Sequence, residues 1–131
     1  MGLSKVVLAN GVFDIFHIGH LRYLEAAAGM GDFLAVAVTR DAFVGKGPGR
    51  PTYNEEERLA VVSALRFVDA AFLTEGVLPA LQRMAPKIFV KGREYQNKIE
   101  PAHAAYCWEH GIEIRFTDTE TVRPRDRLGA S

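Results

Sequence analysis

The stretch K-V-V-L-A-N-G-V-F-D-I-F-H-I-G-H, residues 5–20, decides the fold that we predict for this chain. Its first five residues are mostly apolar and partly β-branched, and they end at Asn10-Gly11, which is typical of a buried strand that enters a turn. Its end leads into a helical pattern over residues 19–28, which two glycines close. A strand that passes directly into a helix predicts the first half of a βαβ unit.

The rest of the chain repeats this alternation of strand and helix. Residues 33–39 are an apolar run without polar alternation, as expected for a strand that is covered on both faces. Residues 40–52 contain three glycines and two prolines, so we expect a loop without any regular element there. Asn54 and the three glutamates after it predict the N-cap of a helix that continues to about Arg66. The other expected strands are residues 68–74, 87–91 and 112–117, and the other expected helices are residues 77–84 and 100–110.

Strands that alternate with helices form right-handed βαβ crossovers and a parallel sheet. The order therefore predicts an α/β, Rossmann-like fold: a doubly wound sheet of five parallel strands with helices on both faces, and residues 5–9 on a central strand. We expect a single domain over residues 1–131. Residues 118–131, which have three arginines and few apolar residues, are interpreted as its tail.

Composition narrows the classes of function. The 131 residues carry 16 Lys and Arg against 16 Asp and Glu, and this balance argues against a protein that coats nucleic acid or an anionic membrane. One cysteine excludes a disulfide framework and suits a reducing compartment. No apolar run approaches the roughly 20 residues of a membrane span, and residues 1–10 lack the pattern of a secretory signal. We therefore expect a cytoplasmic protein without nucleic-acid or membrane partners.

The residues after the first strand are the first place to look for chemistry, because ligands of a doubly wound sheet bind beyond the carboxyl ends of its strands. His17 and His20 lie three residues apart at the expected helix start, so both rings can face the same way, and Gly19 leaves room between them. Helix N-terminal amides bind anions, and two imidazoles beside them can donate hydrogen bonds to phosphate oxygens. Zinc binding is the alternative, but it lacks a clear third ligand, because His103 and His110 lie on a distant predicted helix.

The pattern G-x-F-D-x-x-H-x-G-H after a first strand resembles the motif of the cytidylyltransferase-like superfamily of nucleotidyltransferases, and the resemblance extends over residues 5–117. R-L at residues 58–59 and A-L-R-F-V-D at residues 64–69 resemble the segment that leads into the third strand of that family. K-G-R-E-Y at residues 91–95 is similar to its K-G-x-D-[WY] nucleotide-binding motif, with Glu94 in place of the usual aspartate.

Two stretches are most similar to the small adenylyltransferases of the ADP-heptose synthase type: K-G-P-G-R-P at residues 46–51 and F-V-K-G at residues 89–92. Glycerol-3-phosphate cytidylyltransferase is the next most similar. The letters H-I-G-H also occur in class I aminoacyl-tRNA synthetases. This chain has no K-M-S-K-S loop and no room for an anticodon domain, which argues against a synthetase.

The resemblance implies attack by a substrate phosphate on the α-phosphorus of a nucleoside triphosphate, with release of pyrophosphate. It implies that His17, His20 and Lys46 contact the triphosphate and act in catalysis, with Lys46 on a loop that closes over the phosphates. The expected nucleotide-binding residues are Gly11, Phe13, Gly19, Lys91, Gly92 and Glu94. The expected substrate-binding residues are Asp14, Asp41, Arg58 and Arg66, although Asp14 equally suits a turn cap and the arginines equally suit solvated helix faces.

The resemblance also implies Mg²⁺ bound with the nucleoside triphosphate. We expect phosphate oxygens and water to hold it rather than a protein metal site, since the sequence has no dedicated carboxylate cluster. ATP is favoured over CTP by similarity alone. The implied acceptor is a small phosphorylated substrate, namely a sugar or polyol phosphate, and the implied assembly is a homodimer.

The end of the chain departs from the family. A Ser/Thr-rich motif usually follows the fifth strand, whereas this chain reads T-D-T-E-T-V-R-P-R-D-R at residues 117–127. The departure supports a second hypothesis, a nucleotide-binding module with weak or lost catalysis that acts as a regulatory or assembly partner. The intact pair of His17 and His20 supports the enzyme.

Overall fold

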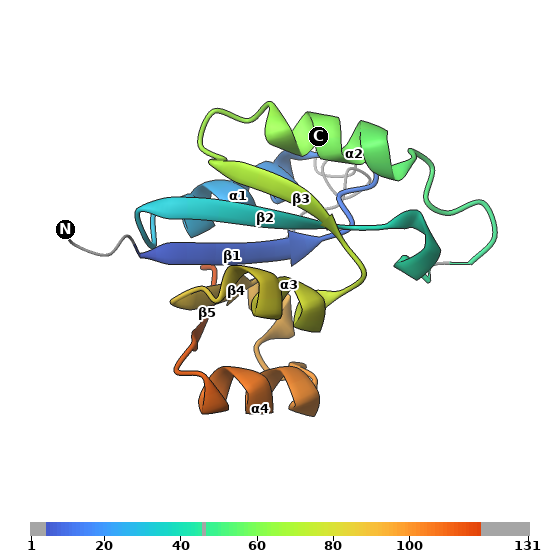
Figure 1. The fold of residues 1–131 in the computed structure, drawn as a ribbon. Coiled ribbons are helices and arrows are strands. Elements are labelled where there is room, and N and C mark those ends of the chain that lie inside the picture. Colours follow the sequence, from blue (N-terminus) through green and yellow to red (C-terminus); the bar gives the residue numbers. More distant parts are fainter. Residues whose placement is uncertain (1–4, 46, 119–131) are drawn as a thin grey trace.

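The computed structural model describes residues 5–45 and 47–118. Strands and helices alternate along these ranges (Figure 1), which confirms the order predicted from the sequence. The strands are β1 (Val6–Gly11), β2 (Phe33–Thr39), β3 (Ala70–Thr74), β4 (Ile88–Lys91) and β5 (Glu113–Phe116). The helices are α1 (Ile18–Ala28), α2 (Glu55–Ser63), α3 (Val77–Met84) and α4 (Pro101–Glu109).

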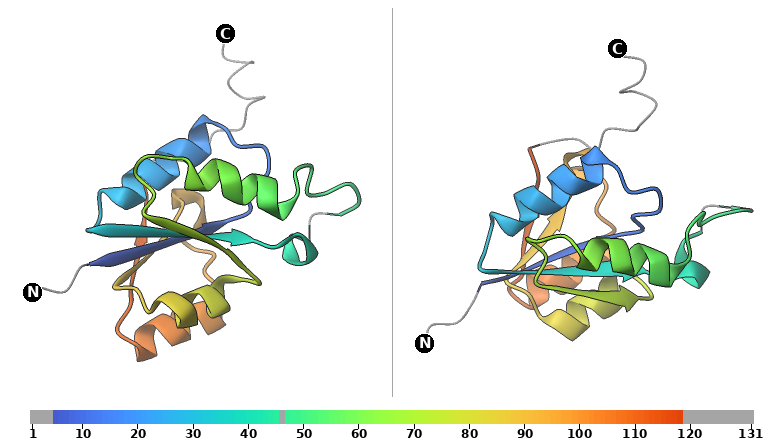
Figure 2. Two further views of the ribbon diagram at one scale, coloured as in Figure 1. Left: turned by 45° about the horizontal axis from the view of Figure 1, so that its top comes forward. Right: turned by 90° about the horizontal axis from the view of Figure 1, so that it is seen from above.

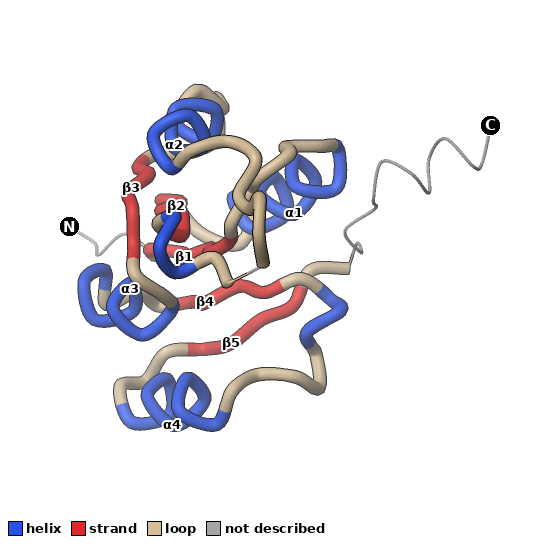
Figure 3. Tube along the Cα trace, turned by 90° about the vertical axis from the view of Figure 1, so that its right-hand side faces the viewer, coloured by secondary structure: helices blue, strands red, loops and turns tan. Residues whose placement is uncertain are grey.

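The five strands are parallel and form one sheet in the order β3-β2-β1-β4-β5. β1 is central, because Val7 pairs with Leu34 of β2 on one side and with Ile88 of β4 on the other. Figure 3, which views the sheet from the carboxyl ends of the strands, shows β3 and β5 at its two edges. The chain winds outward from β1 to β3 and then returns past β1 to β4, so the strand order reverses between β1 and β4. The predicted Rossmann-like, doubly wound sheet is confirmed.

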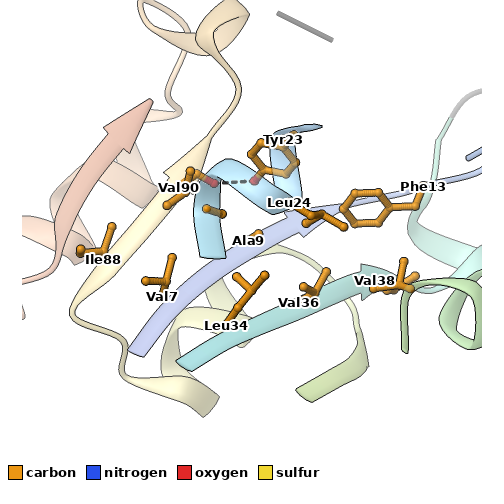
Figure 4. Packing of buried hydrophobic residues seen from close by; sticks show 12 residues of the cluster. Val7, Ala9, Phe13, Tyr23, Leu24, Leu34, Val36, Val38, Ile88 and Val90 are labelled. Carbon is orange, nitrogen blue, oxygen red and sulfur yellow. Dashed lines mark hydrogen bonds between the residues drawn. The ribbon is translucent and has the colours of Figure 1, made fainter. Parts of the chain in front are cut away.

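Helices cover both faces of the sheet, with α1 and α2 on one face and α3 and α4 on the other (Figures 2 and 3). No helix of the described ranges is long and apolar enough to cross a membrane. Residues 34–39 of β2 are all buried, because both of their faces meet helices. Val7 and Ala9 of β1 belong to the core under α1 and α2, which Figure 4 shows, and Leu8 belongs to the core under α3 and α4.

The loop after β2 differs from the expectation that it lacks a regular element. Asp41–Phe43 form one turn of 3₁₀ helix. The amide of Phe43 donates to the carbonyl of Arg40, and the Glu55 carboxylate accepts the amide of Asp41 at 2.8 Å. Side-chain and backbone bonds thus order a turn at the start of a segment that glycine and proline otherwise keep irregular.

Helix α2 begins as predicted and ends earlier. The Asn54 side chain accepts the amide of Glu57, and the Glu57 carboxylate accepts the amide of Asn54, which completes a capping box. The helix ends at Ser63 rather than near Arg66. Leu65, just after the helix, packs against the core under α1 and α2, and the chain then enters β3.

Candidate active site

A pocket of about 520 Å³ opens beyond the carboxyl ends of β1 and β4, where the strand order reverses. Its volume is typical of sites that hold small ligands. Residues from the first βα loop, from the loop before α2 and from the segment after β4 line it. The predicted residues among them are Gly11, Phe13, Asp14, His17, His20, Lys91, Gly92 and Glu94, and the others are Asn10, Val12, Ile15, Tyr23, Thr39, Arg50 and Tyr95.

The two histidines form the N-terminus of α1. His17 is the N-cap, and its Nδ1 accepts a hydrogen bond from the amide of Gly19 at 3.0 Å. The Nδ1 of His20 accepts the amide of His17 at 3.2 Å, and the two ring centroids lie 4.0 Å apart. This is a capping box built from two imidazoles. It satisfies amides that the first turn of a helix leaves without an intrahelical partner.

These bonds determine the tautomer of both rings. A ring nitrogen that accepts a backbone N–H carries no proton, so the proton of the neutral imidazole is on Nε2. Burial lowers the pKa of His17, which favours its neutral form near pH 7. In this tautomer His17 and His20 are Nε2–H donors at the positive end of a helix, where an anion is stabilised. His17 also caps the helix, a structural role that the sequence did not indicate.

Phe13 packs against the histidine pair from the end of β1. Its φ angle is 53°, its side chain is buried, and its ring meets the His20 ring edge-on at a centroid distance of 5.5 Å. Gly11 makes room for this ring, because a Cβ at position 11 would lie 2.8 Å from it. The packing therefore accounts for the glycine, and the nucleotide contacts of both residues stay predictions.

The β4 wall of the pocket consists of Lys91, Gly92, Glu94 and Tyr95. Lys91 ends β4, and its ammonium lies 4.3 Å from the centroid of the Tyr95 ring. Burial lowers the pKa of Lys91, and the Glu94 carboxylate opposes that shift. Glu94 folds back over Gly92, where a Cβ would come within 2.5 Å of the carboxylate. One short segment thus presents a cation and an anion to the pocket.

The β2 wall, on the other side of β1, consists of Asp14, Thr39 and Arg50. The Asp14 carboxylate accepts the amides of Thr52 and Tyr53 at 2.8 and 2.9 Å and Nη1 of Arg50 at 3.3 Å. Burial alone would raise the pKa of Asp14, but these three donors hold it below its usual value. The carboxylate is an ionised anchor for the loop before α2. Of its two predicted roles, the geometry favours the turn cap.

Arg58 holds the ends of β1 and β2 together from inside the protein. Its side chain is 1% exposed, and it donates to the carbonyls of Val12, Thr39 and Tyr53 and, at 2.6 Å, to the carboxylate of Asp41. Neither Arg58 nor Asp41 is among the described residues that line the pocket. The pair supports the β2 wall from behind, and the structure does not bring it into the pocket lining.

Three other predicted residues lie elsewhere or outside the described ranges. Arg66 is exposed in the turn before β3, at the amino ends of the strands, so the structure does not bring it to the pocket. Gly19 is buried in the first turn of α1, where its amide donates a hydrogen bond to Nδ1 of the N-cap residue His17. Lys46 lies outside the described residues, as do residues 119–127 of the altered C-terminal segment.

Some lining residues were missed although the sequence held a signal for them. Asn10 and Tyr95 belong to stretches whose neighbours were singled out. Tyr23 donates to the carbonyl of Val90 at 2.6 Å (Figure 4), and burial raises its pKa, so it ties α1 to the end of β4. Arg50 stands in the quoted K-G-P-G-R-P loop, but its partner Asp14 is 36 residues away in the sequence, and no local pattern reveals that contact.

The charges of the pocket suit a ligand with separated anionic groups. Its cationic side chains among the described residues are Arg50 on the β2 wall and Lys91 on the β4 wall. The two carboxylates, Asp14 and Glu94, each lie beside one of these cations. The start of α1 adds amides and two imidazole donors. Preorganised donors of this kind stabilise negative charge where it develops.

Comparison with known proteins identifies the family of the chain. The family model described as cytidylyltransferase-like matches residues 8–119. The bifunctional protein HldE of Azotobacter vinelandii is 44% identical over 116 residues, which cover 86% of this chain and 24% of that protein. The bifunctional protein HldE of Alcanivorax borkumensis is 39% identical over 119 residues, which cover 88% of this chain and 25% of that protein. The chain thus spans about a quarter of the length of these curated relatives.

Solved structures show the same fold. The lipopolysaccharide core biosynthesis protein from Thermoplasma volcanium is 34% identical with a TM-score of 0.74, and the match covers 88% of this chain and 98% of that chain. Pantothenate synthetase from Thermus thermophilus has a TM-score of 0.67 at 18% identity over 93% of this chain and 58% of that chain, which shows a shared fold alone. From the family model and the relatives together, the chain belongs to the cytidylyltransferase-like family of nucleotidyltransferases.

Proposed function

We propose that this chain transfers a nucleoside monophosphate from a nucleoside triphosphate, with ATP favoured over CTP, to a sugar or polyol phosphate. An oxygen of the acceptor phosphate forms a bond to the α-phosphorus. The bond from the α-phosphorus to the oxygen that bridges to the β-phosphate breaks, and pyrophosphate leaves with that electron pair. Family membership supports the class of reaction. The resemblance to adenylyltransferases of the ADP-heptose synthase type supports ATP and a sugar phosphate.

The observation that carries the proposal is the histidine pair at the start of α1. Backbone amides hold the Nδ1 atoms of His17 and His20 at 3.0 and 3.2 Å, so Nε2–H is the donor of each ring. Negative charge on the phosphate oxygens grows as pyrophosphate leaves, and fixed donors meet it without rearrangement. We assign the pair to the α- and β-phosphate oxygens, where it acts most strongly in the transition state.

The β4 wall suits the nucleotide. Lys91 ends β4 and lines the same pocket as the histidine pair, where its ammonium would balance phosphate charge. Gly92 exposes backbone to the same pocket, as does Gly11 at the end of β1. We assign these groups to the nucleoside triphosphate, and we assign Lys46 to its distal phosphates, as the resemblance implies.

Magnesium accompanies the nucleoside triphosphate in this proposal. Within the described ranges, no three His, Cys, Asp or Glu side chains gather where they could hold a metal ion. Asp14 is engaged by the loop before α2. Phosphate oxygens and water are therefore the ligands that we assign to Mg²⁺. Bound there, it neutralises part of the charge that two anionic reactants bring together.

Thermal shift with ATP, CTP, GTP and UTP, each with magnesium, tests the donor. A ligand that binds only the native state stabilises it by RT ln(1 + [L]/Kd), about 2.7 kcal/mol at a hundredfold excess over Kd. We expect ATP to raise the melting temperature most and free ribose to leave it unchanged. If no triphosphate at millimolar concentration shifts the transition, the proposal is wrong.

Pyrophosphate release tests the acceptor. The preferred triphosphate is incubated with sugar 1-phosphates, glycerol 3-phosphate and the corresponding unphosphorylated compounds. We expect release with at least one phosphorylated acceptor and none with its unphosphorylated control. A protein that binds ATP tightly but releases no pyrophosphate with any acceptor would support the nucleotide-binding module instead.

A further inference from the structure

Arg50 carries the positive charge of the β2 wall. It lies in the loop between β2 and α2, which extends beyond the carboxyl ends of the strands (Figure 2). Its side chain is 46% exposed and lines the pocket, and its Nη1 donates to the Asp14 carboxylate at 3.3 Å. Within the part of the chain that the structure describes, this is the one side-chain hydrogen bond of the guanidinium. Nε and Nη2 are therefore available to a ligand.

Asp14 does not depend on Arg50 for its position. Thr52 and Tyr53 donate their amides to its two oxygens at 2.8 and 2.9 Å, both shorter than the 3.3 Å contact with Arg50. The carboxylate is 6% exposed and fixed by the backbone. The hydrogen bond between Arg50 and Asp14 therefore mainly orients the guanidinium, whereas the amides of Thr52 and Tyr53 fix the loop before α2. An arginine fixed at one nitrogen presents its other donors in a preorganised fork.

The transfer reaction brings two anions into this pocket. The β4 wall and the start of α1 supply the donors that we assign to the nucleoside triphosphate. Arg50 stands on the other side of β1, and a forked guanidinium matches the oxygens of a phosphate. We propose that Arg50 forms the binding subsite for the phosphate group of the acceptor. The inference rests on the proposed function and identifies the group that holds the second reactant.

The other cations near the β2 wall are committed to the protein. Arg58 is 1% exposed and bonded to three backbone carbonyls. Arg40 pairs with Glu55 at 3.3 Å and with Glu75 at 3.0 Å. Neither is among the described residues that line the pocket. Of the described cations on this side of β1, Arg50 is the one that lines the pocket and has N–H donors that are not bonded to the protein.

Inorganic phosphate is the probe that tests this subsite. It is titrated by calorimetry into protein saturated with magnesium and α,β-methylene ATP, an analogue that occupies the nucleotide site and cannot transfer its nucleotide. Arg50→Gln removes the charged fork, so we expect the Kd for phosphate to rise roughly ten- to a hundredfold, as for the loss of a charged hydrogen-bonded pair. The Kd for the analogue should stay within about twofold of wild type.

Arg83→Gln is the matched control, because it removes an exposed arginine whose cation–π contact with Phe72 involves no pocket residue. It should leave both dissociation constants unchanged. Melting temperatures close to wild type will show that both variants fold, since Arg50 and Arg83 are exposed.

Three results would overturn the subsite. The first is equal phosphate affinity in wild type and Arg50→Gln, and the second is no phosphate binding by wild type at millimolar concentrations. The third is a parallel loss of analogue affinity, which would place Arg50 on the nucleotide. If wild type binds no analogue, the proposed function fails separately. Phosphate titration of the ligand-free variants then still decides whether Arg50 binds phosphate.

Discussion

The two walls of the pocket are held in place by contacts of very different reach along the chain. In the β4 wall, the side chains of Lys91, Glu94 and Tyr95 contact residues within the segment 91–95, although the Lys91 carbonyl also accepts the amide of Thr117. In the β2 wall, Asp14 binds Arg50 and the amides that follow it, 36 to 39 residues away. Behind it, Arg58 donates to the carbonyl of Val12, 46 residues away. The side-chain contacts within the β4 wall are local in the sequence, and those of the β2 wall are assembled by the fold.

This difference separates ligand binding from stability. The side chains of the β4 wall are half-buried or exposed and contact close neighbours, so a change there alters the pocket without exposing a core. The supports of the β2 wall satisfy buried backbone groups, so their loss leaves polar groups without partners. Substitutions behind the β2 wall should therefore reduce stability, and substitutions in the β4 wall should reduce nucleotide affinity.

The largest expected effect is that of Arg58→Met. It leaves the carbonyls of Val12, Thr39 and Tyr53 without their donor, so we expect a loss of about 3–5 kcal/mol in the free energy of unfolding. Asp41→Asn is the control. It removes the counter-charge of the buried guanidinium but leaves the backbone bonds of Arg58 in place, and the Asn amide oxygen can still accept from Nη2, so the loss should be smaller, about 1–2 kcal/mol. Urea unfolding measures both, and equal losses would contradict the comparison.

A smaller effect distinguishes two glycines of the pocket. Ala at position 11 places a Cβ 2.8 Å from the buried ring of Phe13, so Gly11→Ala should cost about 1–3 kcal/mol in unfolding free energy. Ala at position 92 meets the end of the flexible Glu94 side chain, so Gly92→Ala should cost less than about 1 kcal/mol.

Gly92→Ala should also separate ATP affinity from stability. Gly92→Ala places a methyl group where we assign backbone to the nucleoside triphosphate and pushes the Glu94 side chain aside, so we expect weaker ATP binding with a nearly unchanged melting temperature. Denaturant unfolding and ATP titration on the same samples check both statements. A Gly92→Ala protein that is as destabilised as Gly11→Ala would show that the β4 wall is not local in its energetics.

The smallest expected effect is the pH dependence from His17. Its pKa is lowered in the folded protein, so the unfolded chain binds the proton first as the pH falls. The stability that this group contributes is complete above the unfolded value of about 6.5 and is lost as the pH falls through the lowered folded pKa. One proton limits the slope to about 1.4 kcal/mol per pH unit. His17→Asn, which keeps an N-cap acceptor and does not titrate, should show a shallower decline below pH 6.5 in melting temperature.

The fold was predictable from the sequence because its signals are local. Uninterrupted apolar runs such as residues 33–39 indicate strands covered on both faces, and Asn54 with its glutamates indicates a helix start. The turn of 3₁₀ helix at residues 41–43 was not predictable, because the Glu55 carboxylate that accepts the amide of Asp41 belongs to the next helix.

In the candidate site, too, residues with local signals were predictable and residues that depend on long-range contacts were not. Residues 91–95 and the histidine pair could be identified because each lies in a short stretch of sequence between a strand and the next helical segment. The roles of Asp14 and Arg58 could not, because a carboxylate or guanidinium that faces a ligand looks the same in the sequence as one that binds distant backbone. Arg50 lies in the K-G-P-G-R-P loop at residues 46–51, but its place in the pocket follows from its contact with Asp14.

The most direct test of the histidine assignment is turnover per folded molecule, with melting temperature, in His17→Asn and His17→Ala. Asn keeps the cap on the amide of Gly19 and removes the Nε2–H donor, whereas Ala removes both. We predict that both variants lose about 10²–10³ in kcat, as for the loss of one preorganised donor. Only His17→Ala should also lose about 1 kcal/mol of stability. Wild-type turnover in His17→Asn would contradict the account.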